Sequence, residues 1–297
     1  MSGELWALLA GTGFGLFQTV NRRAMDGMEV FFATFIQLVI SAFVLAGIAL
    51  FTEDVSLLFS VHFSVILNFA AAGFFHFFIG WTFLNASQKK IGAARTSPLI
   101  GTTPLFATGI AALTLREFPS LLALLGIILI VIGAYVISEK SGGANSRPTE
   151  TGFRAAWLGL SAALCWAISP IFIRAGLKEL NSPLLGVTVG SAVSALGYGI
   201  VLLWQRVRGI KQTATNEAWA FKIVAGILVG LSTWMRWIAL GLAPVAVVLA
   251  ISMVSTPVVI LLSPIVAGKH LERVTVTLWM GAVLILGGAL LLTFISS

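Results

Sequence analysis

Long apolar runs joined by short connectors constrain the fold of this chain more than any other feature. A helix needs about 20 mainly apolar residues to cross a bilayer. Ten segments meet that requirement: 4–22, 29–51, 63–86, 92–115, 119–138, 155–174, 183–204, 218–240, 244–267 and 273–295. Only 10% of the 297 residues are charged, against about a quarter in soluble domains. The sequence therefore predicts an all-α integral membrane protein with ten transmembrane helices.

The second half of the chain repeats the first. Matching residues recur at an offset that grows from 151 to 155: Trp6 and Trp157, Arg23 and Arg174, Trp81 and Trp234, Thr103-Pro104 and Thr256-Pro257, Glu117 and Glu272. Each half contains five predicted crossings, and an odd number turns the second copy upside down. We expect two inverted five-helix repeats, at 1–140 and 155–297, joined by a linker at 141–154.

One segment of each half is interrupted by proline in the same place. Pro104 lies inside the apolar stretch 92–109, and Pro257 lies at the corresponding point of 244–264. Interrupted hydrophobic segments in matching positions of two halves are the best sequence indication of a transport site. The pattern predicts a carrier whose substrate binds between the halves, although each proline is also compatible with a simple kink.

The order and duplication of these features resemble the EamA-type transporters of the drug/metabolite transporter superfamily. In each half a proline near the middle of the fourth helix is followed by a glutamate, in Leu115-Arg-Glu117 and His270-Leu-Glu272. The resemblance covers nearly the whole chain. It implies a basket of ten helices around a central cavity, lined mainly by the first, third and fourth helices of each half. Family members export or exchange amino acids, other metabolites and drugs.

The net charge of +7 is interpreted as a signal of membrane orientation, because the basic residues lie between long apolar runs. Of the 18 Lys and Arg, fourteen fall on one predicted side, and Arg116, Arg174, Lys178 and Arg236 fall on the other. This count places both termini outside the cell, whereas the resemblance implies that both are inside. No basic face suited to nucleic acid is expected. The expected location is the cell membrane of a bacterium or archaeon.

Ionisable residues inside a membrane are costly and are candidates for function. All eleven acids fall at segment ends or in connectors, whereas His76 lies near the middle of the third segment. The repeat maps Phe83 onto Arg236, so we expect His76 and Arg236 to project into one cavity from opposite halves. Arg95 and the hydroxyls of the interrupted segments would add to that cavity. Such a set of donors without acids suits a carboxylate or phosphate, which arginine binds through two hydrogen bonds.

The full set of predicted substrate-binding residues is Gln18, His76, Trp81, Arg95, Thr102, Pro104, Trp166, Ser169, Trp234, Arg236, Ser252, Ser255 and Pro257. Structural interpretations remain open for several of them. Arg236 is close to a helix end and can extend to the interface, and Arg95 follows Lys89 and Lys90 as an orientation signal. His76 is also compatible with a neutral core histidine, and the tryptophans with an interfacial belt.

We interpret the chain as a secondary transporter, an exporter or exchanger of a small organic metabolite, preferably an amino acid or another carboxylate-bearing solute. The alternatives are efflux of lipophilic drugs and, less favoured, a lipid-modifying membrane enzyme. We expect no cofactor or metal, because Cys165 is the single cysteine and no P-loop or metal-ligand spacing is present. The expected partners are the substrate and the bilayer, with the protein acting as a monomer or homodimer.

Overall fold

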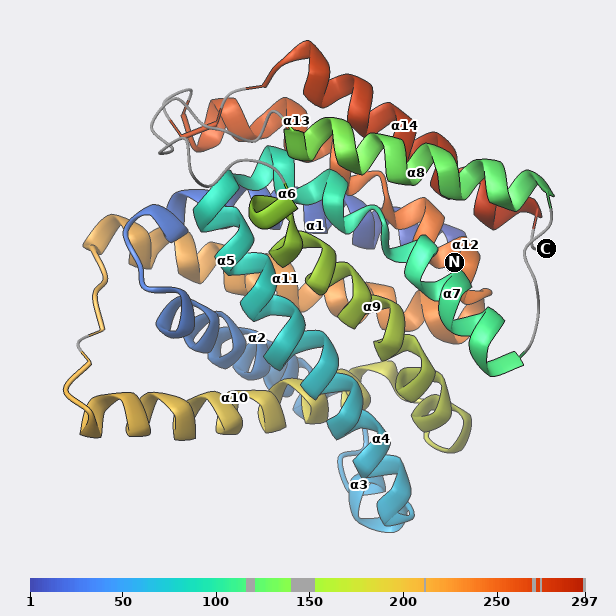
Figure 1. The fold of residues 1–297 in the computed structure, drawn as a ribbon. Helices are drawn as coiled ribbons and strands as arrows, with labels where there is room; N and C mark the ends of the chain where they lie inside the picture. The colour runs from blue at the N-terminus through green and yellow to red at the C-terminus, as the bar shows by residue number, and fades with distance from the viewer. Residues whose placement is uncertain (116–120, 140–152, 211, 269–270, 273, 296–297) are drawn as a thin grey trace.

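The computed structural model describes residues 1–115, 121–139, 153–210, 212–268, 271–272 and 274–295. These residues are helical apart from connectors and one isolated bridge between Met28 and Ala214 (Figure 1). The helices of the first half are α1 (Gly3–Asp26), α2 (Val30–Thr52), α3 (Leu57–Ser60), α4 (Phe63–Gly73), the π-helix η1 (Phe74–Gly80), α5 (Trp81–Ile91), α6 (Ala93–Ile100), α7 (Thr103–Leu115) and α8 (Leu121–Glu139). Those of the second are α9 (Phe153–Glu179), α10 (Pro183–Val207), α11 (Asn216–Leu242), α12 (Val245–Ser252), α13 (Ser255–Val266) and α14 (Val276–Ile295).

The start of several long helices is fixed by a side-chain cap. Ser2 accepts a hydrogen bond from the N–H of Leu5, Ser182 from that of Leu185, and Thr215 from that of Ala218. Each cap satisfies one of the backbone donors that a helix leaves unpaired at its N-terminus. These caps give a local reason for where the three helices begin. The predicted all-α class is confirmed in the described residues.

Both proline-containing segments are broken, as the sequence predicts. The segment at 92–115 divides into α6 and α7, and the segment at 244–267 divides into α12 and α13. Pro104 is the second residue of α7 and Pro257 the third of α13. Proline is well suited to the first turn of a helix, where its missing N–H would have had no partner. The two prolines therefore start new helices rather than bending continuous ones.

Five helices of the described residues are long and apolar enough to cross a membrane: α2, the continuous helix Phe63–Ile91, Ala156–Glu179 of α9, α10 and α11. Shorter apolar helices occur at Leu125–Ile137, Ser255–Val266 and Val276–Leu291. The count of ten crossings stays a prediction. So do the predicted boundaries of the two repeats, because most of the linker at 141–154 lies outside the described residues.

The two halves exchange their packing partners. Helix α1 of the first half packs on α11 of the second, and α9 of the second packs on α4, η1 and α5 of the first. Similarly, α2 packs on α11 while α10 packs on α4, and α8 lies beside α14 (Figure 1). The largest apolar core draws side chains from both halves, among them Phe14, Trp81 and Trp237. This core positions the residues considered next.

Close packing of α4 on α10 requires glycine at position 73. A Cβ added at Gly73 would lie 2.2 Å from the carbonyl oxygen of Gly190. We expect Gly73→Ala to separate the helices and destabilise the fold by about 1–3 kcal/mol. The matched change Gly47→Ala adds a Cβ with no atom within 4 Å and should be neutral or slightly stabilising. Thermal unfolding in detergent measures both, and equal midpoints would contradict this account of the contact.

Candidate functional site

The π-helix η1 places His76 against α9. Its ring is fully buried and stacks on the Trp166 ring, with 5.3 Å between centroids. The Nδ1 atom lies 3.1 Å from the Ser169 hydroxyl, and the indole N–H of Trp166 donates to the His76 carbonyl at 3.2 Å. One helix of each half thus fixes the imidazole. Single π-helical turns frequently occur at functional sites.

Arg236 reaches the same tryptophan from α11. Its side chain is buried rather than extended to the surface, at 5% exposure. The guanidinium carbon lies 5.9 Å from the centre of the Trp166 ring, within range of a cation–π interaction. The two ionisable candidates predicted from the sequence, His76 and Arg236, are therefore brought together around one aromatic side chain.

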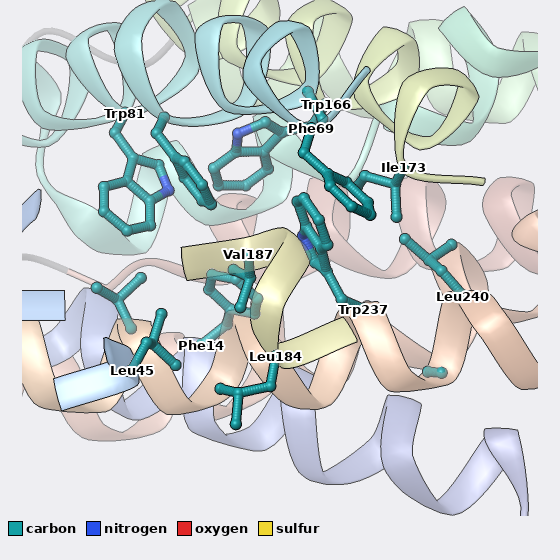
Figure 2. Close-up of a cluster of buried hydrophobic side chains, with 14 of the residues drawn as sticks. Phe14, Leu45, Phe69, Trp81, Trp166, Ile173, Leu184, Val187, Trp237 and Leu240 are labelled. Atoms are coloured by element: carbon teal, nitrogen blue, oxygen red, sulfur yellow. The ribbon is translucent and has the colours of Figure 1, made fainter. Parts of the chain in front are cut away.

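Four buried side-chain nitrogens in this region have no hydrogen-bond partner among the described residues: Nε2 of His76, Nε1 of Trp81, Nε of Arg236 and Nε1 of Trp237. The Phe77 ring contacts His76, Trp81 and Trp237, and Arg236 joins them through Trp166, on which His76 stacks. Figure 2 shows Trp81, Trp166 and Trp237 in one cluster with Phe14 and Phe69. Buried polar atoms are nearly always paired, so a group of orphaned nitrogens from both halves indicates a place for an acceptor.

The chemistry of this donor cluster favours an anion. Indole and guanidinium N–H groups only donate, and Nε2 of His76 also carries a hydrogen when Nδ1 accepts from Ser169. No carboxylate in the described residues bonds to any of the four nitrogens. His76, Trp81 and Trp237 are at most 1% exposed. A solute therefore reaches the donors only after the surrounding side chains move.

Several predicted residues satisfy their polar groups with nearby backbone carbonyls instead. The hydroxyl of Thr102 donates to the Leu99 carbonyl, and that of Ser252 to the Val248 carbonyl. Arg95 is half-buried and donates to the carbonyl of Ile91. These side chains do not bond to the donor cluster. Of the remaining candidates, Trp234 packs half-buried against the large core, Ser255 begins α13, and Pro104 and Pro257 occupy the first turns of α7 and α13.

Gln18 belongs to a separate chain of polar contacts. Its amide nitrogen donates to the Ser97 hydroxyl at 3.5 Å, and its oxygen accepts from Gln88 at 3.4 Å. The Ser97 hydroxyl in turn lies 3.5 Å from that of Thr256. Polar side chains of the broken helices α6 and α13 thus meet α1 between the two halves. No group of three potential metal-ligating residues occurs in the described part of the chain.

Glu272 forms a buried ion pair that also caps a helix. Its carboxylate lies 3.2 Å from Nε of Arg22 and accepts from the backbone N–H groups of Ala93 and Ala94 at the start of α6. Burial raises the pKa of the Glu272 carboxyl above its ordinary value, and the Ala93 N–H and Arg22 act in the opposite direction. Gly92 has a positive φ of 87°, and a Cβ there would lie 2.7 Å from the carboxylate. Only glycine suits this approach.

More contacts join the halves at the same end of the molecule. Arg23 pairs with Glu217 at 2.6 Å, and Met28 forms a backbone bridge with Ala214. We call this end, where Arg22 and Arg23 lie, the basic end. These contacts tie α1 to α11 and to the segment after α13 at this end.

A comparison with protein-family models gives a match to the EamA-like transporter family over residues 1–139 and 153–294. The chain belongs to this family. Its EamA-like architecture consists of two repeats, as the sequence predicts. One solved structure, described only as the crystal structure of a protein, has 16% identity and a TM-score of 0.65 over 97% of this chain and 98% of that one. It supports the fold. A comparison with curated proteins found no match.

The family is one of membrane transporters, which favours transport over the lipid-modifying enzyme considered above. It also agrees with the position of the donor cluster, since this lies where helices of the two repeats meet.

This EamA-like transporter contains a second buried polar cluster, which was not predicted from the sequence. Lys222, counted above among the orientation signals, is fully buried two turns into α11. Its Nζ donates to Oδ1 of Asn21 at 2.5 Å and Oε1 of Gln37 at 2.7 Å. Asn21 also donates to Asn85 and Gln88. The cluster joins α1, α2, α5 and α11 near the basic end.

The internal repeat contained a signal for this cluster. At the offset of 153 that relates Trp81 to Trp234, Lys222 corresponds to Phe69. Phe69 is fully buried in the apolar core, so the repeat places Lys222 at a buried position of α11. The same position of the repeat is therefore occupied by the apolar Phe69 in the first half and by Lys222 in the second.

Proposed function

We propose that this EamA-like transporter moves a small organic solute that bears a carboxylate, with an amino acid as the preferred class. The observation that carries the proposal is the donor cluster of His76, Trp81, Arg236 and Trp237, each of which has one buried nitrogen with no acceptor among the described residues. A carboxylate supplies several acceptor sites and one negative charge, and Arg236 supplies the matching positive charge. Aromatic rings around the donors would enclose the apolar part of the solute.

We further propose that the chain crosses the cell membrane ten times as two inverted five-helix halves, which alternate access to the site. The exchanged packing of the halves supports this arrangement: Gly73 of α4 contacts Gly190 of α10, and the equivalent Gly226 of α11 contacts Ile40 of α2. Broken helices facing each other between repeats are typical of such carriers.

Exchange across proteoliposomes tests the proposed substrate class. Vesicles loaded with an unlabelled L-amino acid should take up the same labelled amino acid, whereas those loaded with its amide should not exchange it. The amide preserves the size of the solute and removes the charge that Arg236 would bind. Uptake of a lipophilic cation such as tetraphenylphosphonium, without exchange of any carboxylate, would contradict the proposal and favour drug efflux.

A further inference from the structure

A pocket of about 720 Å³ lies between α2 and α10 at the basic end, away from the donor cluster. It is lined by Phe32, Phe35, Gly199, Leu202, Leu203, Arg206, Gly209, Ile210 and Gln212. Phe32 and Phe35 form the α2 wall, and Gly199, Leu202 and Leu203 form the α10 wall. We call it the α2–α10 pocket.

The α2–α10 pocket opens toward lipid. Helix α10 is one of the spans that are long and apolar enough for a membrane, and the pocket lies at its C-terminal end. Leu203, Val207 and Ile210 around it are exposed, as is Trp204. Exposed tryptophan at the end of a spanning helix is typical of the membrane–water interface. The apolar walls thus lie at the depth of acyl chains, and the end of the pocket lies at the depth of headgroups.

Positive charge is concentrated at the end of the pocket. The Arg206 guanidinium is exposed and forms no hydrogen bond or ion pair with any described residue. Arg208 lies over the Trp204 ring at 3.9 Å, and residues 199–214 contain no acid. Glu29, at the start of α2, accepts from the N–H of Phe32. Gly209 has a positive φ of 75°, which lets the chain turn back after α10. The backbone N–H of Ile210 then donates to the Gln205 carbonyl at 3.0 Å.

We propose that the α2–α10 pocket is a binding site for one anionic phospholipid, with its phosphate on Arg206 and part of an acyl chain between Phe35 and Leu202. Charge complementarity selects this occupant, because Arg206 and Arg208 lie at headgroup depth on a stretch, 199–214, that contains no acid, and such positive charge attracts lipids that carry net negative charge. The apolar walls distinguish it from a site for a soluble anion. The proposal does not depend on what the transporter carries.

Native mass spectrometry of the full-length protein tests the site. The protein is released from detergent that contains equal amounts of phosphatidylglycerol and phosphatidylcholine. We expect one phosphatidylglycerol to remain bound after phosphatidylcholine is lost. Arg206→Gln should lower that preference about fivefold, the effect of one interfacial charge. Gly199→Phe, which fills a pocket where a Cβ at 199 meets only Phe35 at 3.9 Å, should reduce binding of both lipids.

Two matched variants control for general effects. Lys178→Gln removes an exposed charge at the other end of the bundle, and Gly47→Phe adds a ring where no atom lies within 4 Å. Both should retain phosphatidylglycerol as the wild type does. The ratio of the two lipids is measured within each sample, so a lower yield of folded protein does not alter it. Equal retention of both lipids by the wild type, unchanged retention in Arg206→Gln, or displacement by soluble glycerol phosphate would overturn the proposal.

Discussion

Arg236→Gln is expected to reduce exchange of a carboxylate solute by about a hundredfold or more, because losing one partner of a buried charge pair costs roughly 3–5 kcal/mol. The wild-type arginine is buried and its Nε has no partner in the protein, so the change should leave folding nearly intact. The equivalent residue of the first half, Phe83, carries no charge. Exchange in proteoliposomes measures the first effect and thermal unfolding the second.

The same substitution at Arg95 provides the comparison. Arg95 is half-buried and donates to the Ile91 carbonyl at the end of α5, and Arg95→Gln should change exchange less than about threefold, as expected for a substitution away from the binding site. An Arg236→Gln protein that exchanges the solute at the wild-type rate would remove Arg236 from the binding site. Equal losses in the two variants would indicate a general effect of positive charge instead.

Glu272→Gln should produce the largest loss of stability. The carboxylate is 2% exposed and is paired with Arg22, which is 7% exposed. Removing its charge leaves a buried arginine unpaired, and the expected cost is about 3–5 kcal/mol. Glu217→Gln is the matched control, because the Arg23–Glu217 pair is largely exposed on its acidic side and such pairs contribute less than about 1 kcal/mol.

A double substitution separates pairing from simple loss of charge. Arg22→Met combined with Glu272→Gln removes both charges, so it should be more stable than Glu272→Gln alone. Thermal unfolding in one detergent gives the midpoints of the wild type, the two single variants and the double variant. If Glu272→Gln and Glu217→Gln shift the midpoint equally, the buried pair contributes no more to stability than the exposed pair does.

The broken helices were predictable because their cause is local. Pro104 and Pro257 lack an N–H, so each is stable in a first helical turn and unfavourable further along. The π-helix η1 was not predictable, since Phe74–Gly80 contains no proline and its geometry depends on packing against Trp166 and α9. Periodicity assumed an ordinary α-helix there.

The substrate-binding residues stay predictions, and the signal behind two of them was an ionisable group in an apolar run. His76 and Arg236 were identified that way, and the structure brings them together around Trp166. Hydroxyls gave no such information, because Thr102 bonds to the Leu99 carbonyl from the turn after α6, and Ser252 bonds to the Val248 carbonyl within α12. Lys222 was missed because a lysine near a helix end usually marks orientation. Its burial depends on side chains of α1 and α2 that are distant in sequence.

The most direct test of the central claim is an experimental structure with a bromine-labelled carboxylate such as 4-bromobenzoate. If the orphaned donors form the anion site, the carboxylate should lie within hydrogen-bond distance of Nε of Arg236 and of at least one of the nitrogens of His76, Trp81 and Trp237. The anomalous signal of bromine would then fall among the aromatic rings between the two halves. A carboxylate bound elsewhere, with those four nitrogens paired to acceptors of the protein, would contradict the account.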